Sequence, residues 1–207
     1  MASDTATTTR RRMRADGLRS RERILNEAAR LATVEGLEGL SISRLAEATG
    51  MSKSGLYAHF DSKQDLQLAT IDTAREIMVE AVTRPALAAP RGVERLRAVC
   101  MRFLDYVDQR VFPGGCFYAS TAPEMSMRPG PVRDRIAAHQ REWMAMLNRL
   151  AAEASELGEL PADTDPAQLA FKLNAVVTAA NAAFMLHDDR TALDRARLAV
   201  DELLGAA

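Results

Sequence analysis

The chain contains few of the residues on which catalysis, metal binding and disulfide bonding depend. Its 207 residues include two cysteines, three histidines and one tryptophan. The spacing of Cys100 and Cys116 matches no zinc or thioredoxin-like pattern, and no nucleophile motif or glycine-rich phosphate loop precedes a helix. We therefore expect no metal, no cofactor and no enzymatic activity. Both cysteines are interpreted as structural. A redox switch at Cys116 is the alternative, although nothing nearby in the sequence would lower the pKa of its thiol.

Long apolar runs are scarce as well. An alanine-rich stretch at 169–186 comes nearest to the ~18 residues that a membrane-spanning helix needs, but Lys172 and Asn174 interrupt it. The N-terminus lacks the apolar segment of a signal peptide. These observations predict a soluble cytoplasmic protein with reduced thiols and no membrane partner.

Runs of β-branched residues, which favour strands, are few, whereas alanine is common. Apolar residues make up 47% of the chain, which is enough for a buried core. Their helical spacing predicts an all-α fold of about nine helices. We expect helices at 20–35, from 41 or 43 to 48, and then at 52–60, 62–82, 93–110, 116–124, 132–157, 166–187 and 191–204.

Positive charge is concentrated in the first part of the chain. Residues 1–63 carry 11 Lys and Arg against 8 Asp and Glu, whereas residues 64–207 carry 16 against 20. This split indicates that the N-terminal part alone meets a polyanion. Much of the excess comes from Arg10, Arg11, Arg12 and Arg14, so an unstructured basic tail is the alternative. We divide the chain into a disordered basic arm at 1–18, a small domain at 19–66 and a larger domain at 67–207.

Two short predicted helices joined through Thr49-Gly50 form a helix-turn-helix pattern. On a helical wheel of the second helix, Leu56 and Phe60 share the face that packs on the core. The opposite face consists of small residues only: Ser54, Gly55 and Ala58. Such a bare face lets the backbone approach base edges in the major groove of double-stranded DNA, which predicts a DNA-binding domain at 19–66.

Polar residues surround this bare face. Lys53 lies in the first turn, where recognition helices meet bases. Lys63 stands at the start of the next helix, whose positive end repels a cation but attracts a phosphate. The predicted DNA contacts are Ser43, Arg44, Lys53, Ser54, Gly55, Tyr57, His59 and Lys63. An ordinary surface helix is the alternative for any one of them. The basic arm either reaches a minor groove or makes no contact.

Residues 41–66, SISRLAEATGMSKSGLYAHFDSKQDL, resemble the DNA-binding motif of the TetR family of transcriptional regulators. The family's hallmark is Tyr, any residue, His, Phe and then Lys three residues on, here Tyr57 to Lys63. The resemblance covers about residues 20–66, and PGGCFYAS and RPGPVRDRI look like one C-terminal subtype. It implies a helical ligand-binding and dimerisation domain at 67–207. The family often has Gly and then a polar residue after the helix-initial Lys. Here the order is Ser54-Gly55, so Ser54 or the backbone must read the base.

The predicted helix at 166–187 has a small-residue face, a bulky face and a stripe of polar residues. Small residues let two helices approach closely, so we assign that face to a two-fold partner, packed with the last helix as a four-helix bundle. The predicted dimer contacts are Lys172, Ala175, Ala179, Ala182, Ala183, Leu186 and Leu198. A central helix of a monomer is the alternative.

The polar stripe then faces inward, where buried amides need partners. These side chains either bond to one another and to water, or line a ligand cavity with apolar walls. The candidate cavity residues are Phe103, Tyr106, Cys116, Phe117, His139, Trp143, Met146, Asn174, Thr178 and Asn181. A core filled by side chains is the alternative.

These features favour a homodimeric repressor that a small apolar effector releases from a palindromic operator. A second hypothesis is an architectural or partner-regulated DNA-binding protein without a small ligand. A third is a helical enzyme or binding module that never meets DNA.

Overall fold

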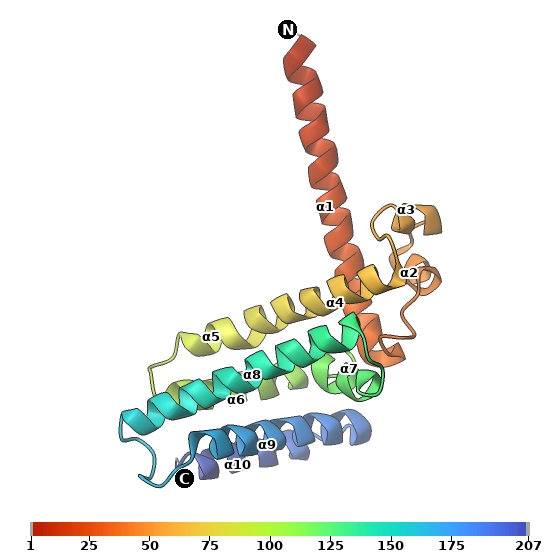
Figure 1. Cartoon of the computed structure of the whole chain (residues 1–207). Coiled ribbons are helices and arrows are strands. Elements are labelled where there is room, and N and C mark those ends of the chain that lie inside the picture. The colour runs from red at the N-terminus through yellow and green to blue at the C-terminus, as the bar shows by residue number, and fades with distance from the viewer. Residues whose placement is uncertain (1, 206–207) are drawn as a thin grey trace.

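The structure, a computed structural model, describes the backbone of residues 2–205 and the side chains of residues 17–205. Within these bounds every regular element is a helix, which confirms the predicted all-α class (Figure 1). The elements are α1 (Ala2–Glu35), α2 (Ile42–Thr49), α3 (Lys53–Tyr57), α4 (Lys63–Met78), the π-helical η1 (Val79–Thr83), α5 (Arg84–Leu87), α6 (Val93–Asp108), α7 (Phe117–Met125), α8 (Pro131–Glu156), α9 (Pro166–His187) and α10 (Thr191–Leu203).

The first helix differs from its prediction. It begins at Ala2, whereas the sequence analysis placed a disordered arm at 1–18 and the helix start at Ser20. Residues 2–19 contain no proline and many good helix formers, and the single Gly17 costs only about 1 kcal/mol. The side chains of Arg10, Arg11, Arg12 and Arg14 lie outside those that the structure describes, so their predicted role stays a prediction.

Local capping fixes the helix-turn-helix. The Ser41 side chain caps α2, and Gly50 ends that helix in the left-handed conformation with φ 67°. The Ser52 side chain caps α3 at the predicted start of that helix, but α3 ends at Tyr57 instead of near Phe60. Leu56 and Phe60 are 0% and 3% exposed, as the helical wheel predicts, and α3 packs against α2.

The fourth helix runs further than predicted. We expected it to end near Val82, before Pro85, but α4 continues without a break through η1 into α5. In η1 the backbone N–H of Arg84 donates to the carbonyl of Val79, the wider spacing of a π turn. Pro85 then lies in the first turn of α5, where its missing N–H is tolerated. Counted as one, this run brings the helices of the described chain to nine.

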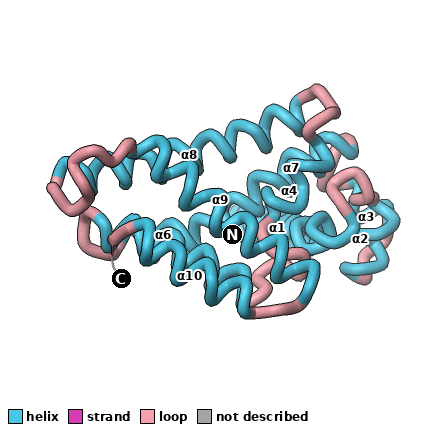
Figure 2. Tube along the Cα trace, turned by 90° about the horizontal axis from the view of Figure 1, so that it is seen from below, coloured by secondary structure: helices cyan, strands magenta, loops and turns pink. Residues whose placement is uncertain are grey.

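The helices form two connected parts. α2 and α3 project beside the N-terminal end of α4, and the long helices of residues 67–205 pack alongside one another below (Figure 1). α9 packs against both α8 and α10, and α7 packs against α1 and α8. α6 packs against both α8 and α9, so these long helices lie alongside one another (Figure 2). The short α7 thus lies where the C-terminal part meets α1.

α9 is unusually apolar for its exposure. It is the one described helix that by length and composition could cross a membrane, yet only 39% of its most apolar window is buried. Core helices of water-soluble proteins also pass this test when they are buried. An apolar helix that stays half uncovered in one protomer needs another surface to cover it.

Candidate DNA-binding surface and effector cavity

The predicted reading surface of α3 is exposed. Tyr57 is 66% exposed, and Lys53, Ser54 and Ala58 are exposed beside it. Among the described residues, neither the Lys53 ammonium nor the Tyr57 hydroxyl has an ion-pair or hydrogen-bond partner. Helix α3 therefore presents a small-residue face flanked by a free cation and a free hydroxyl.

Gly55 has a second reason to lack a side chain. Its backbone N–H donates to Ser52 Oγ at 3.1 Å, and a Cβ on Gly55 would lie only 3.2 Å from that oxygen. A larger residue would crowd the hydroxyl that caps α3. Gly55 was predicted only to let the backbone approach DNA, and its part in the cap of α3 appears in the structure alone.

Two predicted phosphate ligands are engaged within the protein. Arg44 forms ion pairs with Glu35 and Glu47, each at 2.5 Å. The hydrogen bond from Arg44 lowers the pKa of the Glu35 carboxyl. Lys63 Nζ donates to the Glu38 carbonyl at 2.6 Å and to its carboxylate at 3.2 Å. A phosphate must therefore compete with these carboxylates.

The other two candidates flank the reading surface. Ser43 is exposed in the first turn of α2. His59 is half-buried just after α3, with its ring 6.3 Å from that of Phe60. The two therefore differ in how much of the side chain remains open to DNA.

A cavity of about 790 Å³ opens among α4, α6, α7, α8 and α9. Its size lies within the usual range for small-molecule sites, about 300–1,000 Å³. The sequence-predicted candidates that line it are Phe103, Cys116, His139, Trp143, Met146, Asn174 and Thr178. The structure thus brings together predicted residues from α6, α8 and α9 and the start of α7.

Two aromatic candidates lie in the core instead of the cavity wall. Tyr106 is 2% exposed and packs between Phe103 and Phe112, with ring centroids 6.2 and 6.1 Å away. Phe117 is fully buried between Phe112 and Tyr118. Helical spacing placed both rings on the inner side, but only packing against the next layer shows which inner rings reach the cavity.

The polar stripe of α9 has divided roles. Trp143 Nε1 donates to Asn174 Oδ1 at 2.9 Å, and both residues line the cavity with Thr178. Asn181 lies outside it, 4% exposed, and its Oδ1 accepts the Cys116 backbone N–H at 2.9 Å. Asn181 is therefore not among the residues that line the cavity, because the chain before α7 takes its amide oxygen.

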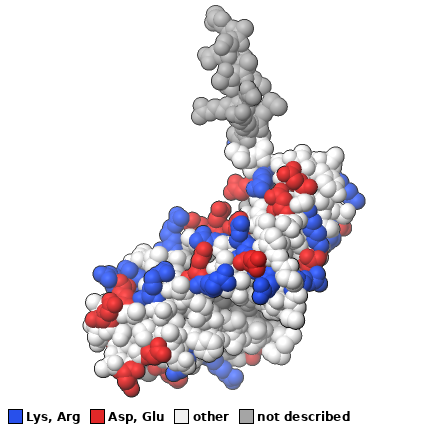
Figure 3. Space-filling model, in the orientation of Figure 1, with Lys and Arg blue, Asp and Glu red and all other residues white. Residues whose placement is uncertain are grey.

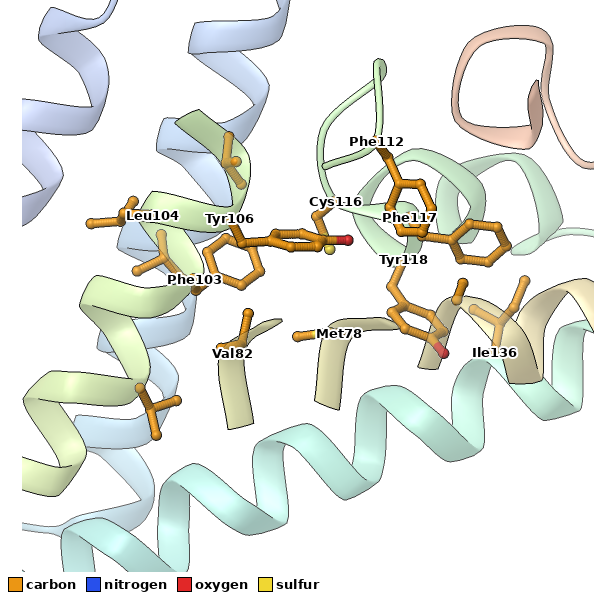
Figure 4. Close-up of a cluster of buried hydrophobic side chains, with 14 of the residues drawn as sticks. Met78, Val82, Phe103, Leu104, Tyr106, Phe112, Cys116, Phe117, Tyr118 and Ile136 are labelled. Atoms are coloured by element: carbon orange, nitrogen blue, oxygen red, sulfur yellow. The ribbon is translucent and has the colours of Figure 1, made fainter. Parts of the chain in front are cut away.

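The buried thiols are not activated. Burial raises the pKa of Cys100 to about 12 and raises that of Cys116 as well. Figure 4 shows the Tyr106 hydroxyl directed toward Cys116. That hydroxyl is buried and has no hydrogen-bond partner in the described part of the chain, and burial raises its pKa. Neutral thiols fit the structural interpretation.

The sequence analysis missed the α4 wall of the cavity. Arg75, Met78, Val79 and Thr83 line it along one face of α4 and η1. Their helical spacing is a signal that the sequence contains, but it does not by itself show which face of the helix turns inward. His139 is tied to that wall, with Nε2 3.4 Å from the Asp72 carboxylate.

The predicted dimer face is exposed on one protomer. Its members Lys172, Ala175, Ala179 and Ala182 are exposed and Ala183 is half-buried. Leu186 is 78% exposed, and Leu198 of α10 is 64% exposed. Figure 3 shows a wide area without charged groups over α9, in the lower part of the molecule. We call these seven residues the α9 face.

Two family models match most of the chain. The model described as "Bacterial regulatory proteins, tetR family" matches residues 24–70, and "Tetracyclin repressor-like, C-terminal domain" matches residues 92–200. The chain belongs to the TetR family of transcriptional regulators. The resemblance seen in residues 41–66 is thereby confirmed.

Known TetR regulators resemble the chain over most of its length. The repressor ComR of Escherichia coli is 24% identical over 76% of this chain and 75% of its own. A TetR regulator from Chloroflexus aurantiacus superposes with a TM-score of 0.85 at 29% identity, covering 92% of this chain and 96% of that one. AibR, solved with isovaleryl coenzyme A and operator DNA, has a TM-score of 0.70 at 26% identity, covering 89% and 98%.

Family membership establishes the class of function. The protein is a helix-turn-helix transcription regulator that binds DNA. TetR regulators bind operators as dimers, respond to small molecules and are in general not enzymes.

Proposed function

We propose that this TetR regulator is a cytoplasmic homodimeric repressor that a small apolar effector releases from a palindromic operator. Residues 19–66 read DNA, and residues 67–207 bind the effector and the second subunit. In this proposal the protein binds DNA and an effector and catalyses no reaction. The observation that carries the proposal is the exposed α3, with its unpaired Lys53 and Tyr57, joined by α4 to a cavity of about 790 Å³.

The DNA contacts follow from the exposure of α3. Lys53 and Ser54 are placed to read bases, because N-terminal residues of a recognition helix enter the major groove. Tyr57 and His59 reach the backbone from either side of the bare face. Lys63 and Arg44 also contact the DNA backbone once phosphates displace their carboxylate partners. The high charge density of DNA favours this displacement.

The α9 face supplies the second reading head. A two-fold axis through this face buries the apolar side chains left open in one protomer and gives two copies of α3. Two recognition helices bind half-sites about one helical turn apart, which requires a palindrome. The exposed apolar surface of α9 is thereby accounted for without a membrane.

The cavity supports an effector. Its wall is mainly apolar but also carries the charged side chains of Arg75, Glu142 and Arg149. Small-molecule sites combine apolar walls with polar groups that orient the ligand. A DNA-binding protein without a ligand would instead fill this space with side chains, so the cavity favours the repressor over the architectural alternative. AibR, a relative in sequence and fold, was solved with isovaleryl coenzyme A, which makes short acyl thioesters a sensible part of any screen.

The DNA-binding part is tested by selecting duplexes from a random pool and measuring affinity against salt. Lys53→Ala should remove one phosphate or base contact, and loss of a phosphate contact lowers the salt slope by about 0.9. Tyr57→Phe should weaken binding by one hydrogen bond, several-fold. Arg141→Ala, an exposed residue of α8, is the matched control. Unchanged affinity in both α3 variants would show that α3 does not meet DNA.

The effector part is tested by thermal melting with a library of small apolar compounds that includes isovaleryl coenzyme A. A compound that raises Tm and weakens binding to the selected operator supports the repressor. Operator binding that no stabilising compound weakens would favour the architectural alternative.

A further inference from the structure

The turn between α1 and α2, residues 36–39, is held by a carboxylate from the distant α7. The backbone N–H groups of Leu37 and Glu38 donate to the two oxygens of Glu124, both at 2.8 Å. Gly36 lies beside it with φ 82°, and a Cβ there would stand 3.1 Å from the same carboxylate. Hydrogen bonds to a charged acceptor are short and strong. We call this contact the Glu124 clamp.

The same turn is held from the other side by α4. Lys63, the first residue of α4, donates to the Glu38 carbonyl at 2.6 Å. Gln67 Nε2, on a side chain only 4% exposed, donates to the Leu37 carbonyl at 2.9 Å. Gln67 Nε2 and Lys63 Nζ also donate to the Glu38 carboxylate, at 3.1 and 3.2 Å. These two bonds, the one from Gln67 first, lower the pKa of the Glu38 carboxyl. The turn is therefore a junction between α7 and the helix that follows α3.

The opposite end of α7 forms part of the cavity wall. Cys116, Tyr118 and Ala119 line the cavity, and Glu124 lies in the last turn of the same short helix, Phe117–Met125. Asn181 of α9 holds the start of α7 through the Cys116 N–H at 2.9 Å. Pro123 lies between these residues and Glu124 and removes one backbone hydrogen bond of the helix. If α7 nevertheless moves as a unit, a shift at its cavity end reaches its carboxylate end.

We propose that Glu124 is a positioning residue through which α7 transmits occupancy of the cavity to the DNA-reading head. With the cavity empty, the clamp fixes the α1–α2 turn, and this turn fixes the start of α4 and with it α3. An occupant that displaces α7 loosens the clamp and frees the head from its DNA-binding position. The inference rests on the proposed effector role of the cavity, yet the clamp can be measured without an effector or an operator.

The first experiment measures amide hydrogen exchange at Leu37 and Glu38 in Glu124→Gln. The substitution keeps the side-chain shape but replaces one acceptor oxygen with an NH₂ group and removes the charge. We expect both amides to exchange at least ~10-fold faster, as loss of charge-assisted bonds implies. Wild-type exchange at both amides would overturn the proposal.

Glu159→Gln is the matched control. The Glu159 carboxylate accepts the Val93 N–H at 2.7 Å, the same kind of bond made inside the C-terminal part. This variant should speed exchange at Val93 and leave Leu37 and Glu38 unchanged. Equal acceleration at the α1–α2 turn would mean general loosening of the fold, which contradicts a specific clamp.

The second experiment is a double-mutant cycle that uses a side chain as the cavity occupant. Ala119→Leu places an isobutyl group on the cavity face of α7, with Ala119→Val as the smaller variant if the first does not fold. We expect either to accelerate exchange at Leu37 and Glu38 in the wild-type background, and to add nothing in the Glu124→Gln background. Additive effects, or no effect of either occupant, would refute transmission through the clamp.

These outcomes separate the inference from the proposed function. If duplex selection finds no specific site, the repressor proposal fails while the exchange cycle still decides whether the clamp couples α7 to the head. If an operator is found, Glu124→Gln should bind it more weakly and lose most of the response of affinity to Ala119→Leu. Such loss of response is not expected from a residue that only stabilises the fold.

Discussion

Leu186→Ala should weaken the homodimer by an amount that the exposure of this side chain bounds. The truncation removes about three CH₂ equivalents, ~2.4 kcal/mol at full burial. Because 78% of Leu186 is exposed in one protomer, about 1.9 kcal/mol of this is available to an interface. A two-fold interface contains the substituted residue once in each subunit. The upper limit of the loss in dimerisation free energy is therefore about 3.7 kcal/mol, a several-hundred-fold rise in Kd.

Sedimentation equilibrium over a range of protein concentrations measures this Kd directly. Leu18→Ala is the control, since Leu18 is 70% exposed on α1, far from the α9 face. It should leave the dimer unchanged. The reasoning is refuted if Leu186→Ala dimerises as tightly as the wild type, because the α9 face would then not be the interface.

Three further predictions concern the reading head and the core. Glu47→Gln removes one of the two carboxylates that hold Arg44 and should tighten DNA binding a few-fold with a steeper salt slope, seen by titration at several salt concentrations. Asn181→Ala leaves a buried backbone N–H without its acceptor and should cost about 1–3 kcal/mol in denaturant unfolding, whereas Asn148→Ala, on the exposed side of α8, should change little. The pKa of Glu38 is lowered in the fold, so its contribution is complete above the ordinary Glu pKa of about 4.3 and is lost as pH falls through the lower folded value. Acid melts of wild type and Glu38→Gln should converge as that contribution disappears.

The sequence predicted the helices well wherever a local signal marks an end. Ser52, Ser62 and Asp165 cap α3, α4 and α9 at or next to the predicted helix starts, since a capping side chain acts on backbone groups within a turn of itself. The start of α1 and the run of α4 through Pro85 were predicted wrongly. The start of α1 depends on the sum of weak helix propensities, and the run through Pro85 depends on a π turn. No single residue in the sequence signals either of them.

The candidate sites divide in the same way. Periodicity placed Lys53 and Tyr57 on the open side of α3 and Leu56 on the closed side, because one helix face is buried as a unit. It did not show that Arg44 and Lys63 are already paired with carboxylates, since Glu35 and Glu38 lie on other elements. Partners that are far apart in sequence carry no local pattern.

The amino-acid sequence by itself determined the all-α class, the position of the reading helix and the presence of the hallmark motif of the TetR family. These depend on residue types at fixed short spacings, which the helix geometry converts directly into faces and ends. Only the tertiary structure decided which inner side chains line the cavity and that Glu124 grips the α1–α2 turn. Those facts depend on how separate helices pack, and packing is set by the shapes of all the contacting side chains together.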